Sequence, residues 1–161
     1  MGRLAGVLFL FFLAPAFVTA EAANVTGAKI VDFGLYSYDA VSPASRAHDA
    51  TKVKGERLIK TTSKIEAKTG LTFGFRFMLY GSPSGEEVTL QFKGATPVLK
   101  NPDTGRETDR EEWEFVTAIE GIAFVGYTFD HSWEISPGRW TFQVLSEGRP
   151  IATKTFTIMK R

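Results

Sequence analysis

Apolar and polar residues alternate with a period of two along most of this chain, which is typical of β-strands that bury one face. The clearest example is the segment 71–80. Its apolar face consists of Phe73, Phe75, Phe77 and Leu79, and its other face of Thr72, Gly74, Arg76 and Met78. We therefore expect this segment to be a core strand.

Seven further segments show strand character. They are residues 30–38, 57–65, 88–92, 113–119, 122–129, 139–145 and 151–159. In the first of them, Val31, Phe33 and Leu35 share one face, and Asp32, Gly34, Tyr36 and Tyr38 share the other. Near the C-terminus, Trp140, Phe142 and Val144 share a face, as do Phe156 and Ile158. This alternation predicts antiparallel sheets with one solvated side.

Turn-forming residues separate these segments, most clearly at 81–85, 101–105 and 146–149. The polar stretch 39–55 is expected to be a long connection. The charged run 106–112 is expected to be a solvated loop or a single helical turn. About seven to nine short strands without a helix predict an all-β antiparallel sandwich, with a closed barrel as the alternative.

Residues 1–20 have the features of a secretory signal peptide. Arg3 precedes a dense apolar run, 7–13, and small residues follow up to Ala20. Pro15 interrupts a run that is too short to cross a bilayer, which needs roughly 20 apolar residues. Cleavage after Ala20 would leave a short N-terminal segment, 21–27, and one sandwich domain, 28–161, with no stable membrane anchor. We therefore expect a periplasmic or secreted bacterial protein.

Composition narrows the possible partners. The chain has no cysteine, and its formal net charge of +1 falls to zero without Arg3. A domain of about 140 residues buries roughly two-thirds of its unfolded surface, so it can fold without disulfides. Nucleic-acid binding needs a basic excess, which this chain lacks. Nucleic acid is therefore excluded as a partner.

No set of residues matches a catalytic or metal-binding motif, so we expect neither enzyme activity nor a metal or cofactor. There are two histidines, His48 and His131, and Asp130 beside the second would point to the opposite face of a strand. The run 101–112 resembles a calcium loop, but Gly105 and Arg106 stand where such a loop needs an oxygen ligand and a glycine. Acid pairs for glycoside hydrolysis could be drawn from Asp109, Glu111, Glu112, Asp130 and Glu134.

Aromatic residues are the most suggestive feature. Most of the Phe, Tyr and Trp side chains must belong to the core, because large rings dominate burial in small sandwiches. A few fall on polar faces or near turns, where a ring could stack on a sugar or on a partner. Those proposed as ligand-binding residues are Tyr36, Tyr38, Tyr127 and Trp133. The alternative is that such rings close the ends of the sandwich.

Several motifs, taken in order, resemble those of a bacterial family of exported domains that is described only as a domain of unknown function. The motifs are the segments 28–36, 72–77, 101–106, 126–130 and 137–143, and the resemblance covers most of residues 27–158. It implies an immunoglobulin-like β-sandwich in an exported protein. It implies no activity and carries over no catalytic or binding residue.

Together these observations predict a non-enzymatic exported β-sandwich that binds another envelope protein, through an edge strand or loops, or a small ligand. Edge strands offer unpaired backbone groups to a partner strand, which gives affinity without a conspicuous motif. Two alternatives stay open. One is a carbohydrate-binding module that uses the aromatic residues above, and the other is an envelope hydrolase that uses acids from the 109–134 region.

Overall fold

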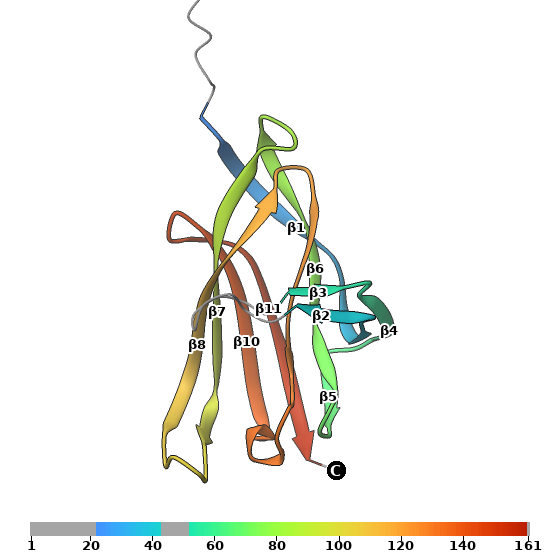
Figure 1. Cartoon of the computed structure of the whole chain (residues 1–161), viewed down its shortest axis with the longest axis vertical. Coiled ribbons are helices and arrows are strands. Elements are labelled where there is room, and N and C mark those ends of the chain that lie inside the picture. Colours follow the sequence, from blue (N-terminus) through green and yellow to red (C-terminus); the bar gives the residue numbers. More distant parts are fainter. Residues whose placement is uncertain (1–21, 43–51, 161) are drawn as a thin grey trace, which may run out of the picture.

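The computed structural model describes residues 22–42 and 52–160 of the 161-residue chain. Nine strands form two open sheets of four and five strands, and a small two-stranded sheet accompanies them (Figure 1). The closed-barrel alternative therefore does not hold. The only helical element in the described residues is one 3₁₀ turn, η1, Ser132–Glu134. No helix in this part of the chain is long and apolar enough to cross a bilayer.

The four-stranded sheet has the strand order β4-β1-β6-β9, with antiparallel pairing throughout. Its strands are β1 (Asn24–Ser37), β4 (Arg57–Thr61), β6 (Thr72–Ser82) and β9 (Ile122–Thr128). β1 and β6 pair along nearly their whole length, from Asn24 opposite Ser82 to Tyr36 opposite Thr72. β9 lies at one edge of this sheet.

The five-stranded sheet has the order β5-β11-β10-β7-β8 (Figure 1). Its strands are β5 (Lys64–Ala67), β7 (Glu87–Lys100), β8 (Glu107–Ala118), β10 (Gly138–Ser146) and β11 (Arg149–Lys160). The pairing is antiparallel except between β11 and β5, which run parallel. The small third sheet is the hairpin of β2 (Ala40–Ser42) and β3 (Lys52–Lys54).

The core lies between the two large sheets, and the period-two pattern sets it as expected. Phe73, Phe75, Phe77 and Leu79 are fully buried, and the predicted apolar face of β10 meets them from the other sheet. Phe73 is the centre of this core, since its ring contacts five others. They belong to Tyr127, Phe129, Trp140, Phe142 and Phe156. Packing of this kind holds the domain together without a crosslink.

Several expectations about local structure were wrong. The charged run 106–112 is neither loop nor helical turn but mostly strand, because β8 begins at Glu107 and pairs with β7. The single strand expected at 57–65 divides into β4 and β5, which belong to different sheets. The polar stretch 39–55 contains the β2–β3 hairpin, although its residues 43–51 lie outside the described part. Val31 is half exposed, because the ladder with β6 shifts between Ile30 and Asp32.

Candidate functional site: the free edge of β9 and the sheet face beside it

The outer face of the four-stranded sheet carries a polar cluster that joins β1 to β6. Arg76 lies opposite Asp32 in the ladder and forms an ion pair with it, with Nε 3.0 Å from Oδ1. The hydroxyl of Tyr36 donates a hydrogen bond to the same Oδ1 at 2.5 Å. Both charged side chains are largely shielded from water, with 29% and 18% of the Arg76 and Asp32 side chains exposed. The cluster therefore ties the two central strands together.

Electrostatics fix the protonation of this cluster at neutral pH. The hydrogen bond from Arg76 holds the pKa of Asp32 below its ordinary value, against the opposing effect of burial. Burial and the hydrogen bond to Asp32 raise the pKa of Tyr36 far above its ordinary value. Asp32 therefore stays ionised and Tyr36 protonated. Such a cluster braces the sheet and offers no group that titrates near pH 7.

A row of three glycines crosses the same face beside the cluster. Gly34 lies opposite Gly74, and Gly74 lies opposite Gly126. A Cβ on Gly74 would sit only 2.2 Å from the carbonyl oxygen of Val125, so no larger residue fits there. The ring of Phe124 lies over Gly126 and packs on Tyr36, with 4.7 Å between the ring centroids. The glycine row thus leaves room on this face for the two aromatic rings to contact each other.

β9 is an edge strand without charge. Its sequence, IAFVGYT, contains no charged residue and no proline. Within the part of the chain that the structure describes, its one ladder partner is β6. Ile122 at its start is half exposed. An apolar, unpaired edge of this kind is a template for another strand.

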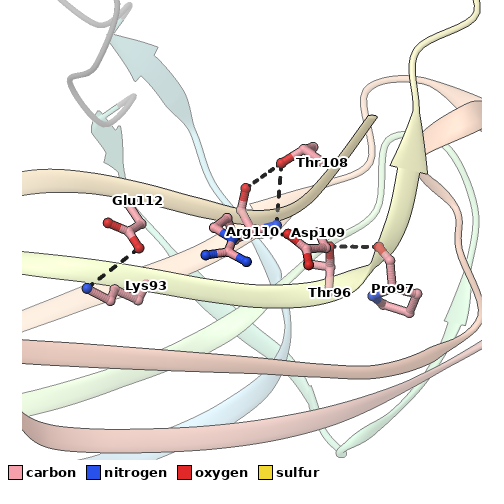
Figure 2. Close-up of polar contacts among 7 residues, drawn as sticks. All are labelled: Lys93, Thr96, Pro97, Thr108, Asp109, Arg110 and Glu112. Atoms are coloured by element: carbon pink, nitrogen blue, oxygen red, sulfur yellow. Dashed lines mark hydrogen bonds and ion pairs between the residues drawn. The ribbon is translucent and has the colours of Figure 1, made fainter. Parts of the chain in front are cut away.

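The other three edges carry the charges that natural sheets use to prevent such pairing. The β8 edge is also capped by a side chain, as Figure 2 shows. The hydroxyl of Thr108 donates to the carbonyl oxygen of Arg110 at 2.7 Å and accepts a long contact from the Arg110 backbone N–H. Ion pairs add to this edge, Arg110 with Asp109 and Lys93 with Glu112 (Figure 2).

β5 and β4 are short and charged as well. The hydroxyl of Thr62 lies 3.0 Å from both the backbone N and the backbone O of Lys64, the first residue of β5. β4 has five residues, of which Arg57 and Lys60 are basic. β9 therefore stands apart from the edges at β4, β5 and β8.

An acidic and aromatic cluster lies near the C-terminal end of β9. Glu134 in η1 accepts hydrogen bonds from the backbone N–H groups of Asp130 and His131, at 2.6 and 3.0 Å. Burial, together with the charge of Glu134, raises the pKa of Glu111. Burial is also the main reason why the pKa of Tyr127 is raised, and the negative charges of Glu111 and Glu134 add to this effect. Glu134 is occupied as a cap of the 3₁₀ turn, so it serves the fold.

The four aromatic residues proposed for ligand binding do not lie on one surface. Tyr36 is buried on the outer face of the four-stranded sheet, under contact with Phe124. Tyr127 lies opposite Phe73, and its ring packs inward on Trp140 at 5.0 Å. Tyr38 follows β1 and is partly exposed, and Trp133 in η1 stacks on the imidazole of His131 at 5.8 Å. A ligand-binding role for each stays a prediction, but they form no common platform.

The other candidate residues are spread over the molecule. Asp109 and Glu112 lie at the solvent-exposed edge in ion pairs, whereas Glu111 is partly buried near Glu134. The side-chain oxygen of Asn101 accepts the backbone N–H groups of Asp103 and Thr104, which makes the 101–105 segment a capped turn. Within the described ranges, no three His, Asp or Glu side chains lie together as a metal site would need. His48 lies outside the described residues.

Comparison with models of known protein families identifies the family of this chain. A family model described as a domain of unknown function, DUF3859, matches residues 24–158. The chain belongs to this family. The DUF3859 match spans both large sheets, from the start of β1 nearly to the end of β11, and it confirms the family type expected from the sequence motifs.

A solved structure confirms the fold of this DUF3859 domain. It is an immunoglobulin-like protein from Pseudomonas aeruginosa, 25% identical in sequence, with a TM-score of 0.58. The match covers 88% of this chain and 98% of that protein. No curated protein matches the chain. The immunoglobulin-like sandwich is therefore established, and the function has to be argued from the molecule itself.

Sequence reasoning named edge strands as binding elements but did not single out β9. A usable signal was present, because IAFVGYT is a strand pattern free of charge and proline. What the sequence lacked was the position of that strand in its sheet. Without it, an uncharged strand has the same pattern as a central one.

Proposed function

We propose that this protein is a non-enzymatic, exported immunoglobulin-like module that binds a partner chain of the bacterial envelope by adding a β-strand at the β9 edge. The observation that carries the proposal is the contrast among the four edges. Three have charges or threonine caps, and β9 has neither. Natural sheets blunt the edges they keep free, so an edge left bare supports a role in pairing.

Strand addition also fits the chemistry of the molecule. Backbone hydrogen bonds supply the affinity in this binding mode, and alternate side chains supply the specificity. The outer face of β9 offers Ile122 and Phe124 for such side-chain contacts. The Asp32–Arg76 brace and the core packing of Val125 hold β9 and its neighbours rigid, which lowers the entropic cost of binding.

The exported location rests on the signal-peptide features of residues 1–20. We expect the mature chain to begin after Ala20, or at the neighbouring positions Ala22 or Ala23, and to fractionate with the periplasm or the medium. Intact-mass spectrometry of protein isolated from its host tests this directly. A mature protein that retains residues 1–20 would overturn the exported part of the proposal.

The binding part is tested with a displayed library of extended heptapeptides, which matches the seven residues of β9. Selection on the purified protein is expected to yield peptides in which apolar residues alternate. The Phe124→Pro variant removes an N–H that faces the free edge and should weaken their binding about tenfold, because one backbone hydrogen bond to the peptide is lost. Failure to select any peptide on protein kept at a concentration where it is monomeric would refute the proposal.

Two variants make this test specific. Phe124→Leu also loses the aromatic ring but keeps the backbone N–H, so it should retain most of the binding. Glu112→Pro introduces a proline on the free side of the charged edge strand β8 and should leave peptide binding unchanged. Peptides that bind the Phe124→Pro variant as well as the unmodified protein would show that they do not add to β9.

A further inference from the structure

The backbone groups on the free side of β9 can be assigned from the ends of its ladder with β6. The N–H of Leu79 donates to the carbonyl of Gly121, and the N–H of Phe129 donates to the carbonyl of Leu71, both at 3.1 Å. In an antiparallel pair, hydrogen-bonded and non-hydrogen-bonded positions alternate. The odd-numbered residues of β9 therefore bond to β6. The backbone groups of Ile122, Phe124, Gly126 and Thr128 face outward.

We propose that the strand added at this edge is β9 of a second copy of the chain, paired antiparallel about a two-fold axis at Val125. This inference rests on the proposed function and names its partner. In this register Phe124 lies opposite Gly126 of the second copy, and Ile122 lies opposite Thr128 of the second copy. All of these are outward-facing positions, so both copies present donors and acceptors to each other. The two four-stranded sheets then join into one continuous sheet.

The side chains of β9 are self-complementary in this register. On the outer face, the large Phe124 meets the small Gly126, and on the inner face the large Tyr127 meets the small Ala123. At the axis, Val125 meets its own counterpart. Opposing a large residue to a small one lets the two strands pair without overlap of their side chains. No charge lies within the pairing strands, so no like charges are opposed along the seven residues of the ladder.

The rings of β9 leave the free edge accessible. Phe124 leans over Gly126 toward Tyr36 on β1, which lies on the far side of β6. Tyr127 packs inward on Trp140 and Phe129. Neither ring therefore covers the outward N–H and C=O groups. The first acids beyond the strand, Glu120 and Asp130, lie outside the ladder at its two ends.

Sedimentation equilibrium of the purified protein across the micromolar range tests the proposal. The unmodified protein, the Phe124→Leu variant and the Glu112→Pro variant should form dimers. The Phe124→Pro variant loses one N–H at each of two symmetric positions, and its dissociation constant should rise about tenfold or more. A dimer that survives this substitution unchanged would overturn the proposal, because it would use another surface.

A second measurement does not depend on the stability of the proline variant. Val125→Cys introduces a single thiol into a chain without cysteine. Directly opposed non-hydrogen-bonded residues lie about 4.5 Å apart between Cα atoms, which suits a disulfide. Mild oxidation should convert this variant to a covalent dimer, whereas Glu112→Cys should stay monomeric under the same conditions. Absence of the Val125→Cys crosslink would overturn the proposed register.

The outcomes separate this inference from the proposed function. A protein that stays monomeric but binds selected heptapeptides at β9 would refute the self-pairing and leave strand addition in place. A protein that stays monomeric and binds no peptide would refute both. A dimer that is sensitive to Phe124→Pro and crosslinks through Val125→Cys supports both.

Discussion

Replacing Phe73 by Ala removes the ring at the centre of the core. Phe73 has no exposed surface, and its ring lies 5.2 to 6.3 Å from the centroids of five others. Deleting a buried Phe side chain costs about 3–5 kcal/mol, from lost transfer energy and from the cavity that remains. The rigid rings around the site belong to both sheets and collapse poorly into a gap. We therefore expect the upper half of that range.

This loss converts into a large fall in melting temperature. With an unfolding entropy of about 2.1 cal/mol/K per residue, a domain of about 140 residues loses roughly 3 °C for each kcal/mol. The Phe73→Ala variant should melt about 12–15 °C below the unmodified protein. Because small domains have a stability of only about 5–15 kcal/mol, a loss of this size removes a large fraction of it.

Urea unfolding followed by tryptophan fluorescence measures the effect, since the indole of Trp140 lies 5.8 Å from the Phe73 ring. The midpoint should fall while the slope of the transition stays constant. Phe73→Leu refills most of the cavity and should cost less than half as much. A loss below about 1 kcal/mol in Phe73→Ala would refute the view that this ring is the centre of the core.

Three further predictions test the sheet face and the buried charges. Gly74→Ala should lower the melting temperature strongly, because the added Cβ would overlap the carbonyl oxygen of Val125. The control Gly27→Ala should leave the melting temperature nearly unchanged, because a Cβ there meets no atom within 4 Å. Asp32→Asn should cost about 1.5–3 kcal/mol at pH 7 in urea unfolding. Since the folded pKa of Asp32 is lowered, that difference should shrink as the pH falls below the ordinary pKa of Asp and vanish only below the lowered folded pKa; a constant difference would contradict the assignment. Glu111→Gln should change the free energy of unfolding in the opposite direction. Because burial raises the folded pKa of Glu111, ionisation of this side chain destabilises the native state as the pH rises above the ordinary value of 4.5. The variant should therefore be more stable than the unmodified protein at pH 7 and equally stable at low pH.

The strands that form the centre of the sandwich could be predicted from sequence because burial has a period of two. Phe73, Phe75 and Phe77 follow that period without interruption and are buried as expected. The prediction failed where the local pattern is weak. Five of the six residues 107–112 are charged, and they form a strand because β7 offers them backbone groups to pair with.

The candidate site was only partly accessible from the sequence. Tyr36 and Tyr127 were grouped because both are aromatic and lie in strands. They point to opposite faces of the same sheet, since Tyr36 lies opposite Thr72 and Tyr127 opposite Phe73. A shift of one residue in register reverses the face of every side chain. The direction of each ring therefore depended on ladder positions that no local pattern encodes.

By itself the sequence determined that the chain is an all-β domain, which faces of most of its main strands are buried, and that the segment 122–128 carries no charge. The tertiary structure decided that β9 lies at an edge, that its even-numbered residues face outward, and that three glycines align across the sheet. The physical reason is that hydrophobic period is a property of neighbouring residues, whereas strand order and register depend on contacts between segments far apart in the chain.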